Sequence, residues 1–280
     1  MSMTWAPPAS GTTFGKWTLR RLLGRGWQGE VWSATALNGD EAAIKLFAKV
    51  RPSLYARFRA DITTLIGQGA LHGVVPLLDH HLPERLGDER PWYVMLIGVP
   101  LVDDPRLTHP GMKAASIFNV ARLLTPIHER GLSHRNIKPA NLLRIDGALR
   151  IADWGLVCHP EESPIAVRRE DSSPFATIAP EVREGRDERD GRPADVYSLA
   201  KTLWMLKTNS TLGFEGQYSP TGMSGSELRR GMAHLYPTFF GPLDSLLLDC
   251  TDDRPARRPT LSEFKDRLDA WMYMGTKDDD

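Results

Sequence analysis

Short β-prone runs separated by glycine turns make up the first third of the chain. The runs cover residues 17–23, 29–36, 41–47, 74–80 and 91–98. Between the third and fourth runs, apolar side chains recur at helical spacing and predict one helix over residues 54–66. The apolar positions of this helix are Leu54, Phe58, Ile62, Leu65 and Ile66. The pattern predicts a small antiparallel sheet of five strands with one helix.

The pattern changes after Gly98, where helical spacing replaces strand alternation. Helices are predicted over residues 112–130, 194–208, 225–235, 241–250 and 260–272, and a hairpin is predicted to turn on Asp146-Gly147. No internal repeat is present in the sequence. The expected fold class is therefore α+β, with a small sheet first and a larger, mainly helical part after it.

The composition of the chain indicates which partners it can bind and in which compartment it works. The chain has 280 residues, with 35 Lys+Arg against 35 Asp+Glu, so it lacks the basic excess that nucleic acids and membrane surfaces reward. Its two cysteines, Cys158 and Cys250, cannot form a disulfide framework, which favours a reducing cytoplasm. No signal peptide or membrane-spanning run is found; residues 1–14 are expected to be a flexible lead and residues 273–280 an acidic tail.

A glycine-rich turn lies between the first two predicted strands. Gly24, Gly26 and Gly29, followed by Val31, fit the pattern G-x-G-x-x-G-x-V, which lets bare backbone approach phosphate oxygens. The same glycines also fit a plain turn, or a dinucleotide-binding fold, although there a helix rather than a strand follows. On the third strand, Ala42-Ala43-Ile44-Lys45 matches the V-A-I-K pattern, whose lysine pairs with phosphates; a random surface lysine is the alternative.

Three further motifs follow in the second part of the chain. Residues 134–141 read His-Arg-Asn-Ile-Lys-Pro-Ala-Asn, close to H-R-D-x-x-x-x-N, and Asp153-Trp154-Gly155 is close to D-F-G. Ala179-Pro180-Glu181 matches A-P-E. With these motifs in order, the chain resembles the protein-kinase superfamily, of the bacterial Ser/Thr type, over about residues 17–272.

The resemblance implies a bilobal kinase domain over residues 15–272, with an N-lobe over 15–98 and a C-lobe over 99–272. It implies Mg-ATP as cofactor, with Lys45 on the phosphates and Asn141 and Asp153 as hard oxygen ligands of Mg²⁺. Lys138 would neutralise charge on the γ-phosphate. Asp61 stands where a glutamate would pair with Lys45, although it is one methylene shorter and a plain surface position is an alternative.

The resemblance also implies an adenine pocket and a set of structural residues. The positions implied for the pocket are Val31, Ala43, Met95, Leu143 and the backbone of Leu96, Ile97 and Gly98. Ordinary core packing explains each of them equally well. The implied structural residues are His134 and Trp154, which pack together, the pair Glu181 and Arg258, and Asp195, at the start of a helix, which anchors the catalytic loop of residues 134–141.

Two departures from the family pattern affect the catalytic base and the binding of the substrate peptide. Asn136 replaces the aspartate that accepts the substrate proton, and its neutral amide cannot take a proton at neutral pH. Pro174 stands where a peptide-positioning threonine is expected. Asn136 fits either a natural pseudokinase that serves as a nucleotide-binding scaffold, or a recent replacement in a competent enzyme. The retained Asn141 and Asp153 favour the competent enzyme, whereas Pro174 and Asp61 favour the pseudokinase.

The expected function is that of a Ser/Thr protein kinase fold with transfer strongly reduced by Asn136. Its partner would be a protein substrate with a Ser or Thr acceptor, or the chain itself. Regulation is expected at Arg135, which pairs with an activation-segment phosphate in some kinases. The candidate acceptors are Ser163, Ser172, Ser173 and Thr177. A small-molecule phosphotransferase is disfavoured by the A-P-E motif and its partner Arg258.

Overall fold

The computed structural model describes most of the chain in two compact units. Described are residues 5–26, 29–47, 55, 59, 62–63, 66, 72–87, 89–108, 110–154, 175–185, 190–233 and 239–275. The described residues up to Gly98 belong to the first unit and those from Val99 onward to the second.

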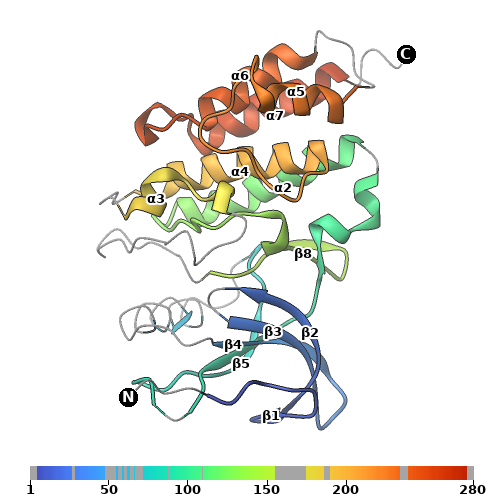
Figure 1. Ribbon diagram of the computed structural model, residues 1–280, viewed down its shortest axis with the longest axis vertical. Coiled ribbons are helices and arrows are strands. Elements are labelled where there is room, and N and C mark those ends of the chain that lie inside the picture. Colours follow the sequence, from blue (N-terminus) through green and yellow to red (C-terminus); the bar gives the residue numbers. More distant parts are fainter. Residues whose placement is uncertain are drawn as a thin grey trace. The chain divides into compact units, whose positions relative to one another are not determined.

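The first unit contains a single antiparallel sheet, coloured blue to green-blue in Figure 1. Its strands are β1 (Thr13–Phe14), β2 (Trp17–Gly26), β3 (Gly29–Ala36), β4 (Glu41–Phe47), β5 (Leu77–His81) and β6 (Trp92–Met95). Their order in the sheet is β1-β2-β3-β4-β6-β5. The five predicted strands are present, and a sixth, the two-residue β1 within the predicted lead, pairs with the start of β2. The sheet confirms the predicted fold class for this part of the chain.

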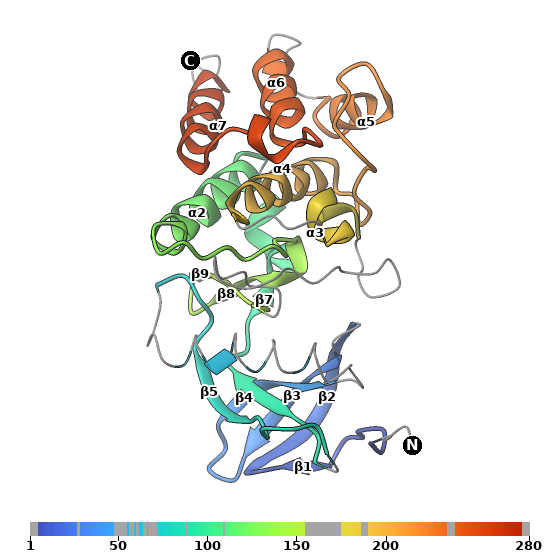
Figure 2. The ribbon, with the colours of Figure 1, turned by 90° about the vertical axis from the view of Figure 1, so that its left-hand side faces the viewer.

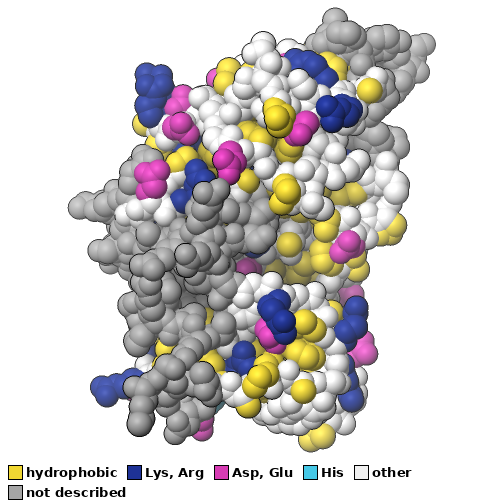
Figure 3. Space-filling model, in the orientation of Figure 1, with side chains coloured by type: hydrophobic (Ala, Val, Ile, Leu, Met, Phe, Trp, Pro, Cys, Tyr) yellow, Lys and Arg dark blue, Asp and Glu magenta, His cyan; other side chains and the backbone are white. Residues whose placement is uncertain are grey.

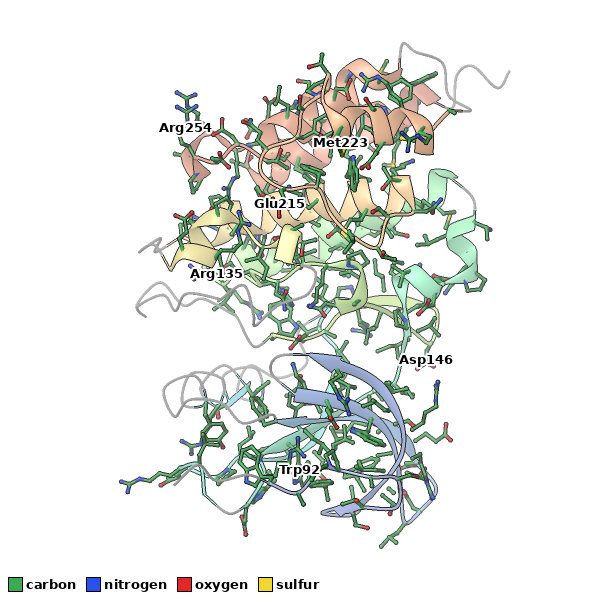
Figure 4. All side chains as sticks on the ribbon, viewed as in Figure 1. Trp92, Arg135, Asp146, Glu215, Met223 and Arg254 are labelled. Carbon is green, nitrogen blue, oxygen red and sulfur yellow. The ribbon has the colours of Figure 1, made fainter. Side chains whose placement is uncertain are left out.

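Alternation along β4 divides the sheet into two faces. Ala42, Ile44 and Leu46 point into a core that also contains three tryptophans, Trp17, Trp32 and Trp92. Trp92 is labelled in Figure 4. The indole N–H of Trp17 donates to Asp79 Oδ2 at 2.9 Å, and that of Trp32 to Glu30 Oε2 at 2.9 Å. Both indole N–H groups therefore have a hydrogen-bond acceptor at the edge of the core.

The predicted helix over residues 54–66 lies mostly outside the described residues. The residues of this span that are described, Tyr55, Arg59, Ile62, Thr63 and Ile66, are helical. Ile62 is 1% exposed, as its place on the apolar face predicts, but Ile66 is 41% exposed. The apolar positions predicted for this helix are therefore not all buried.

The second unit is mainly helical, as predicted, and appears from green to red in Figure 2. Its helices of five residues or more are α2 (Pro110–His128), α3 (Pro180–Glu184), α4 (Arg192–Thr208), α5 (Met223–Gly231), α6 (Phe240–Cys250) and α7 (Leu261–Gly275). A small sheet of β7 (Val99–Pro100), β8 (Leu142–Ile145) and β9 (Ala148–Ile151) includes the predicted hairpin. Among the described residues, no helix is long and apolar enough to cross a membrane.

Helix α4 runs through the middle of the second unit, beside α2 in both views (Figures 1 and 2). Every residue from Ala194 to Lys207 is buried, although the sequence includes five polar or charged side chains in that span. Two of them are lysines. Burial lowers the pKa of Lys201 to about 6 and that of Lys207 to about 8, both from 10.5.

These lysines make stability depend on pH. Between pH 6 and 10.5 the unfolded chain binds a proton at Lys201 that the folded chain does not, so the free energy of unfolding should rise with pH. We expect Lys201 to contribute about 1 kcal/mol per pH unit in this window. Urea unfolding at pH 7 and pH 9 measures the slope, which should become shallower in Lys201→Met. An unchanged slope would show that Lys201 stays protonated in the folded chain.

Candidate active site

The glycine-rich segment forms the end of the β2–β3 hairpin. Gly24 pairs with Val31 and Gly26 with Gly29, while Trp27 and Gln28 lie outside the described residues. Gly29 has φ +149°, a backbone angle that favours glycine. A Cβ built on Gly24 or Gly26 would meet no heavy atom within 4 Å. Packing therefore does not require glycine at these two positions, and the bare backbone is left open to a ligand.

Residues predicted to bind the nucleotide gather on one face of the sheet. Lys45 pairs with Val31 of β3 on one side and with Tyr93 of β6 on the other, and Ala43 pairs with Met95. Side chains at paired and alternate positions share a face, so Val31, Ala43, Lys45 and Met95 lie together on the face opposite the tryptophan core. The structure thus brings together four residues from three strands.

Tyr93 belongs to the same face and was missed in the sequence. Lys45 is 4% exposed, and its Nζ lies 6.0 Å from the centroid of the Tyr93 ring. The available signal was the position of Tyr93 two residues before Met95 on the same strand. In the predicted hinge, the Leu96 N–H already donates to Pro76 O at 3.4 Å. Asp61, the expected partner of Lys45, lies outside the described residues.

In the second unit, Asp195 holds the segment His134–Asn141 by its backbone. The fully buried carboxylate accepts hydrogen bonds from the N–H of His134 at 2.8 Å and of Arg135 at 2.6 Å. His128 Nε2 lies 2.9 Å from the same carboxylate. Arg135 has φ +61°, which is rare outside glycine, so these bonds offset a strained backbone. Arg135 is labelled in Figure 4. His128 was missed in the sequence, since nothing local links it to Asp195.

The ring of His134 is fixed by its two nitrogens. Nδ1 accepts the N–H of Asn136 at 3.2 Å, so the proton is on Nε2, which donates to Ala152 O at 3.0 Å. Burial lowers the pKa of His134, which favours this neutral form. The Trp154 ring packs edge-on against it, with centroids 4.5 Å apart. His134 therefore joins the loop to the strand end that carries Asp153.

The two implied metal ligands are Asn141, at the end of the loop His134–Asn141, and Asp153, two residues after strand β9. Asn141 Nδ2 donates to the carbonyl of Asn136 at 2.8 Å, and the Asn141 carbonyl accepts the N–H of Ala152 at 2.8 Å. Asp153 follows Ala152 directly, with φ +64°. Within the described ranges, no cluster of three His, Cys, Asp or Glu side chains forms a metal site. One amide and one carboxylate nevertheless suit Mg²⁺, which takes its other ligands from water and phosphate.

Asn136 sits at the centre of the loop and is 3% exposed. Both its backbone N–H and its carbonyl are engaged, so the position of its amide side chain is set by the loop. Thr202 Oγ1 on α4 also donates to Ile137 O at 3.3 Å, a contact missed in the sequence. Lys138 is half-buried next in the loop, and Leu143 is 8% exposed on β8 of this second unit.

The segment around the A-P-E motif is anchored by the expected ion pair. Arg258 Nη1 and Nη2 contact the two oxygens of Glu181 at 2.6 and 2.8 Å, with both side chains buried. Thr177 is fully buried, so this predicted phosphate acceptor is not accessible in this conformation. Ser163, Ser172, Ser173, Pro174 and Gly155 lie outside the described residues. Cys250 is buried, and burial raises the pKa of its thiol.

The surface carries charges of both signs. On the face in Figure 3, described Lys and Arg side chains alternate with Asp and Glu, and no extended basic patch is seen there.

Comparison with known proteins finds relatives that cover most of the chain. The family model for the protein kinase domain matches residues 107–268, more than half of the chain. The DNA damage-responsive serine/threonine-protein kinase RqkA of Deinococcus radiodurans is 33% identical over 206 residues, covering 70% of this chain and 30% of that protein. Serine/threonine-protein kinase PkaB of Streptomyces coelicolor is 31% identical over 275 residues, covering 90% of this chain and 62% of PkaB.

A solved structure has a similar fold. The kinase domain of PknI from Mycobacterium tuberculosis superposes with a TM-score of 0.64 at 25% identity, covering 95% of this chain and 99% of that domain. The chain spans between 30% and 62% of the length of the first curated relatives that it matches.

Proposed function

The chain belongs to the protein kinase family, and from this premise we propose that it binds Mg-ATP and transfers the γ-phosphate to Ser or Thr hydroxyls of proteins, at a rate strongly reduced by Asn136. The single observation that supports this most is the loop His134–Asn141, held in place by Asp195. The backbone of Arg135 is strained, which costs free energy that packing alone would not require, and the hydrogen bonds to Asp195 and to the His134 ring hold the loop in this conformation.

The proposed roles follow the chemistry of the side chains. Lys45 would neutralise the α and β phosphates, with the bare backbone of the glycine-rich hairpin over the phosphate oxygens. Asn141 and Asp153 would hold Mg²⁺, which when bound offsets the charge of the phosphates. Lys138 would offset charge that develops on the γ-phosphate. Val31, Ala43 and Met95, on one face of the sheet of the first unit, are assigned to the adenine ring.

Asn136 determines how fast the chain works. Its amide oxygen can accept a hydrogen bond from the substrate hydroxyl and so orient it, but it cannot take up the proton. Phosphoryl transfer depends mainly on positioning and charge stabilisation, so a slow reaction remains compatible with this residue. The partners proposed are therefore protein substrates and the chain itself, in the cytoplasm. The balance of 35 basic and 35 acidic residues supports neither a nucleic acid nor a membrane as partner.

A second candidate is a pseudokinase that binds nucleotide and serves as a scaffold, which Asn136 itself favours. Transfer of radiolabelled phosphate from Mg-ATP to the chain and to a generic basic protein separates the two. Three forms should be compared: the chain as it is, Asn136→Asp, and Asn136→Asp with Asp153→Asn as the matched loss of a metal ligand. Transfer by Asn136→Asp alone supports the kinase. If every form binds nucleotide and none transfers phosphate, the pseudokinase scaffold is supported instead.

A further inference from the structure

Lys201 of α4 is a buried lysine that contacts a loop rather than a carboxylate. It is 0% exposed, and its Nζ donates to Phe214 O at 2.8 Å and to Gly216 O at 2.6 Å. The same nitrogen lies 3.4 Å from the centroid of the Phe214 ring and 5.0 Å from that of Tyr197. Burying an amine in a helix core is costly, so these contacts are the reason to expect a role for it.

The loop held by Lys201 connects α4 to α5. Tyr197 Oη, one turn before Lys201 on α4, also donates to Gly216 O at 3.3 Å. The Phe214 ring packs edge-on against Trp204, with centroids 5.0 Å apart. Glu215, between the two held carbonyls, is labelled in Figure 4, and Figure 2 shows this loop passing beside α3. Three side chains of α4 therefore fix residues 213–216 to this helix: Tyr197, Lys201 and Trp204.

The other side of this loop touches the segment that leads into the A-P-E motif. A Cβ built on Gly213 would lie 2.8 Å from the Cβ of Ala176, so the loop backbone packs directly on that residue. The next residue, Thr177, gives its carbonyl to Ser198 Oγ on α4 at 2.7 Å. Helix α4 thus holds residues 213–216 and residues 175–177 together, through side chains one turn apart or less.

We propose that Lys201 is a positioning residue for the protein substrate, which acts by holding residues 213–216 against residues 175–177. This rests on the proposed function. The motif that normally positions the acceptor peptide is altered just before these residues, because Pro174 replaces the expected threonine. A second anchor for the same segment is what this chain needs if it is to bind a protein substrate.

The contact of residues 213–216 with residues 175–177 is called the clamp below. Limited chymotrypsin digestion tests it, with cleavage of the Phe214–Glu215 bond followed by mass spectrometry. Lys201→Met keeps an apolar stem of similar length but cannot donate, so cleavage there should become at least about tenfold faster. Lys207→Met is the matched control, because Lys207 is also buried on α4 but lies against the Trp271 ring. It should leave this cleavage unchanged. Gly213→Ala, which pushes the loop from Ala176, should act like Lys201→Met even if that variant folds poorly.

The role toward substrate is tested in the Asn136→Asp form. Lys201→Met should raise KM for a protein substrate at least about threefold with KM for ATP unchanged, whereas Lys207→Met should move neither. Unchanged cleavage at Phe214 in both Lys201→Met and Gly213→Ala overturns the clamp. Faster cleavage with an unchanged KM for protein overturns the substrate role. If Asn136→Asp transfers no phosphate, the proposed function fails, and with it the substrate role, while digestion still decides the clamp.

Discussion

The Asn136→Asp variant is expected to transfer phosphate about 10²- to 10⁴-fold faster than the chain with Asn136, the range typical of a general base. The two side chains have nearly the same shape, and the backbone of residue 136 is fixed by the His134 ring and by Asn141. The change therefore adds a proton acceptor without moving the loop. Single-turnover transfer from Mg-ATP to a protein substrate measures it.

The gain should appear in kcat and not in nucleotide affinity, because residue 136 is assigned to the hydroxyl and not to ATP. Asn136→Ala is the control: it removes the hydrogen bond to the hydroxyl as well, and should be slower than the chain as it is. Equal rates for Asn and Asp at position 136, with both forms binding ATP, would show that proton removal does not limit the reaction. Equal rates would also remove the reason to regard this chain as impaired.

The sheet could be predicted from sequence because its signals are local. The β-prone runs alternate with period two and are separated by glycine turns, and β2 to β6 fall on the five predicted runs. Helix α3 was not predicted, since its five residues from Pro180 to Glu184 are too short to show a period. Ile66 is exposed although it is one of the apolar positions of its helix, because helical spacing alone does not show where the core ends.

The contacts that fix the candidate site were harder to predict because they join distant positions. The resemblance placed Asp195 near the catalytic loop, but His128 and Thr202, which share that task, have no motif around them. Helix α4 is buried on all sides from Ala194 to Lys207, so the five polar residues in this span gave no indication of which ones have a structural role. Lys201 looks like a surface residue in the sequence, and its partners Phe214 and Gly216 lie beyond the end of the helix.

Replacing Arg258 with methionine is expected to destabilise the fold by about 3–5 kcal/mol, the range measured when one partner of a buried ion pair is removed. The Arg258 side chain is 0% exposed and that of Glu181 3%, so Glu181 would be left as a buried carboxylate without its cation. Arg258 Nε also donates to Asp252 O at 2.8 Å, and that carbonyl would lose its donor. Urea unfolding at pH 7 gives the change in free energy.

The double variant Glu181→Gln with Arg258→Met is the informative control. Removing both charges leaves no unpaired ion, so it should be more stable than Arg258→Met alone, even though it has lost the same pair. The segment from Thr177 to Glu181 would then be held by the Ser198 contact and by packing of Ile178 and Val182 against Tyr197. Two results would show that water reaches this ion pair and that the pair does not anchor the segment. One is a loss of less than about 1 kcal/mol of unfolding free energy in Arg258→Met, and the other is a double variant that is less stable than Arg258→Met.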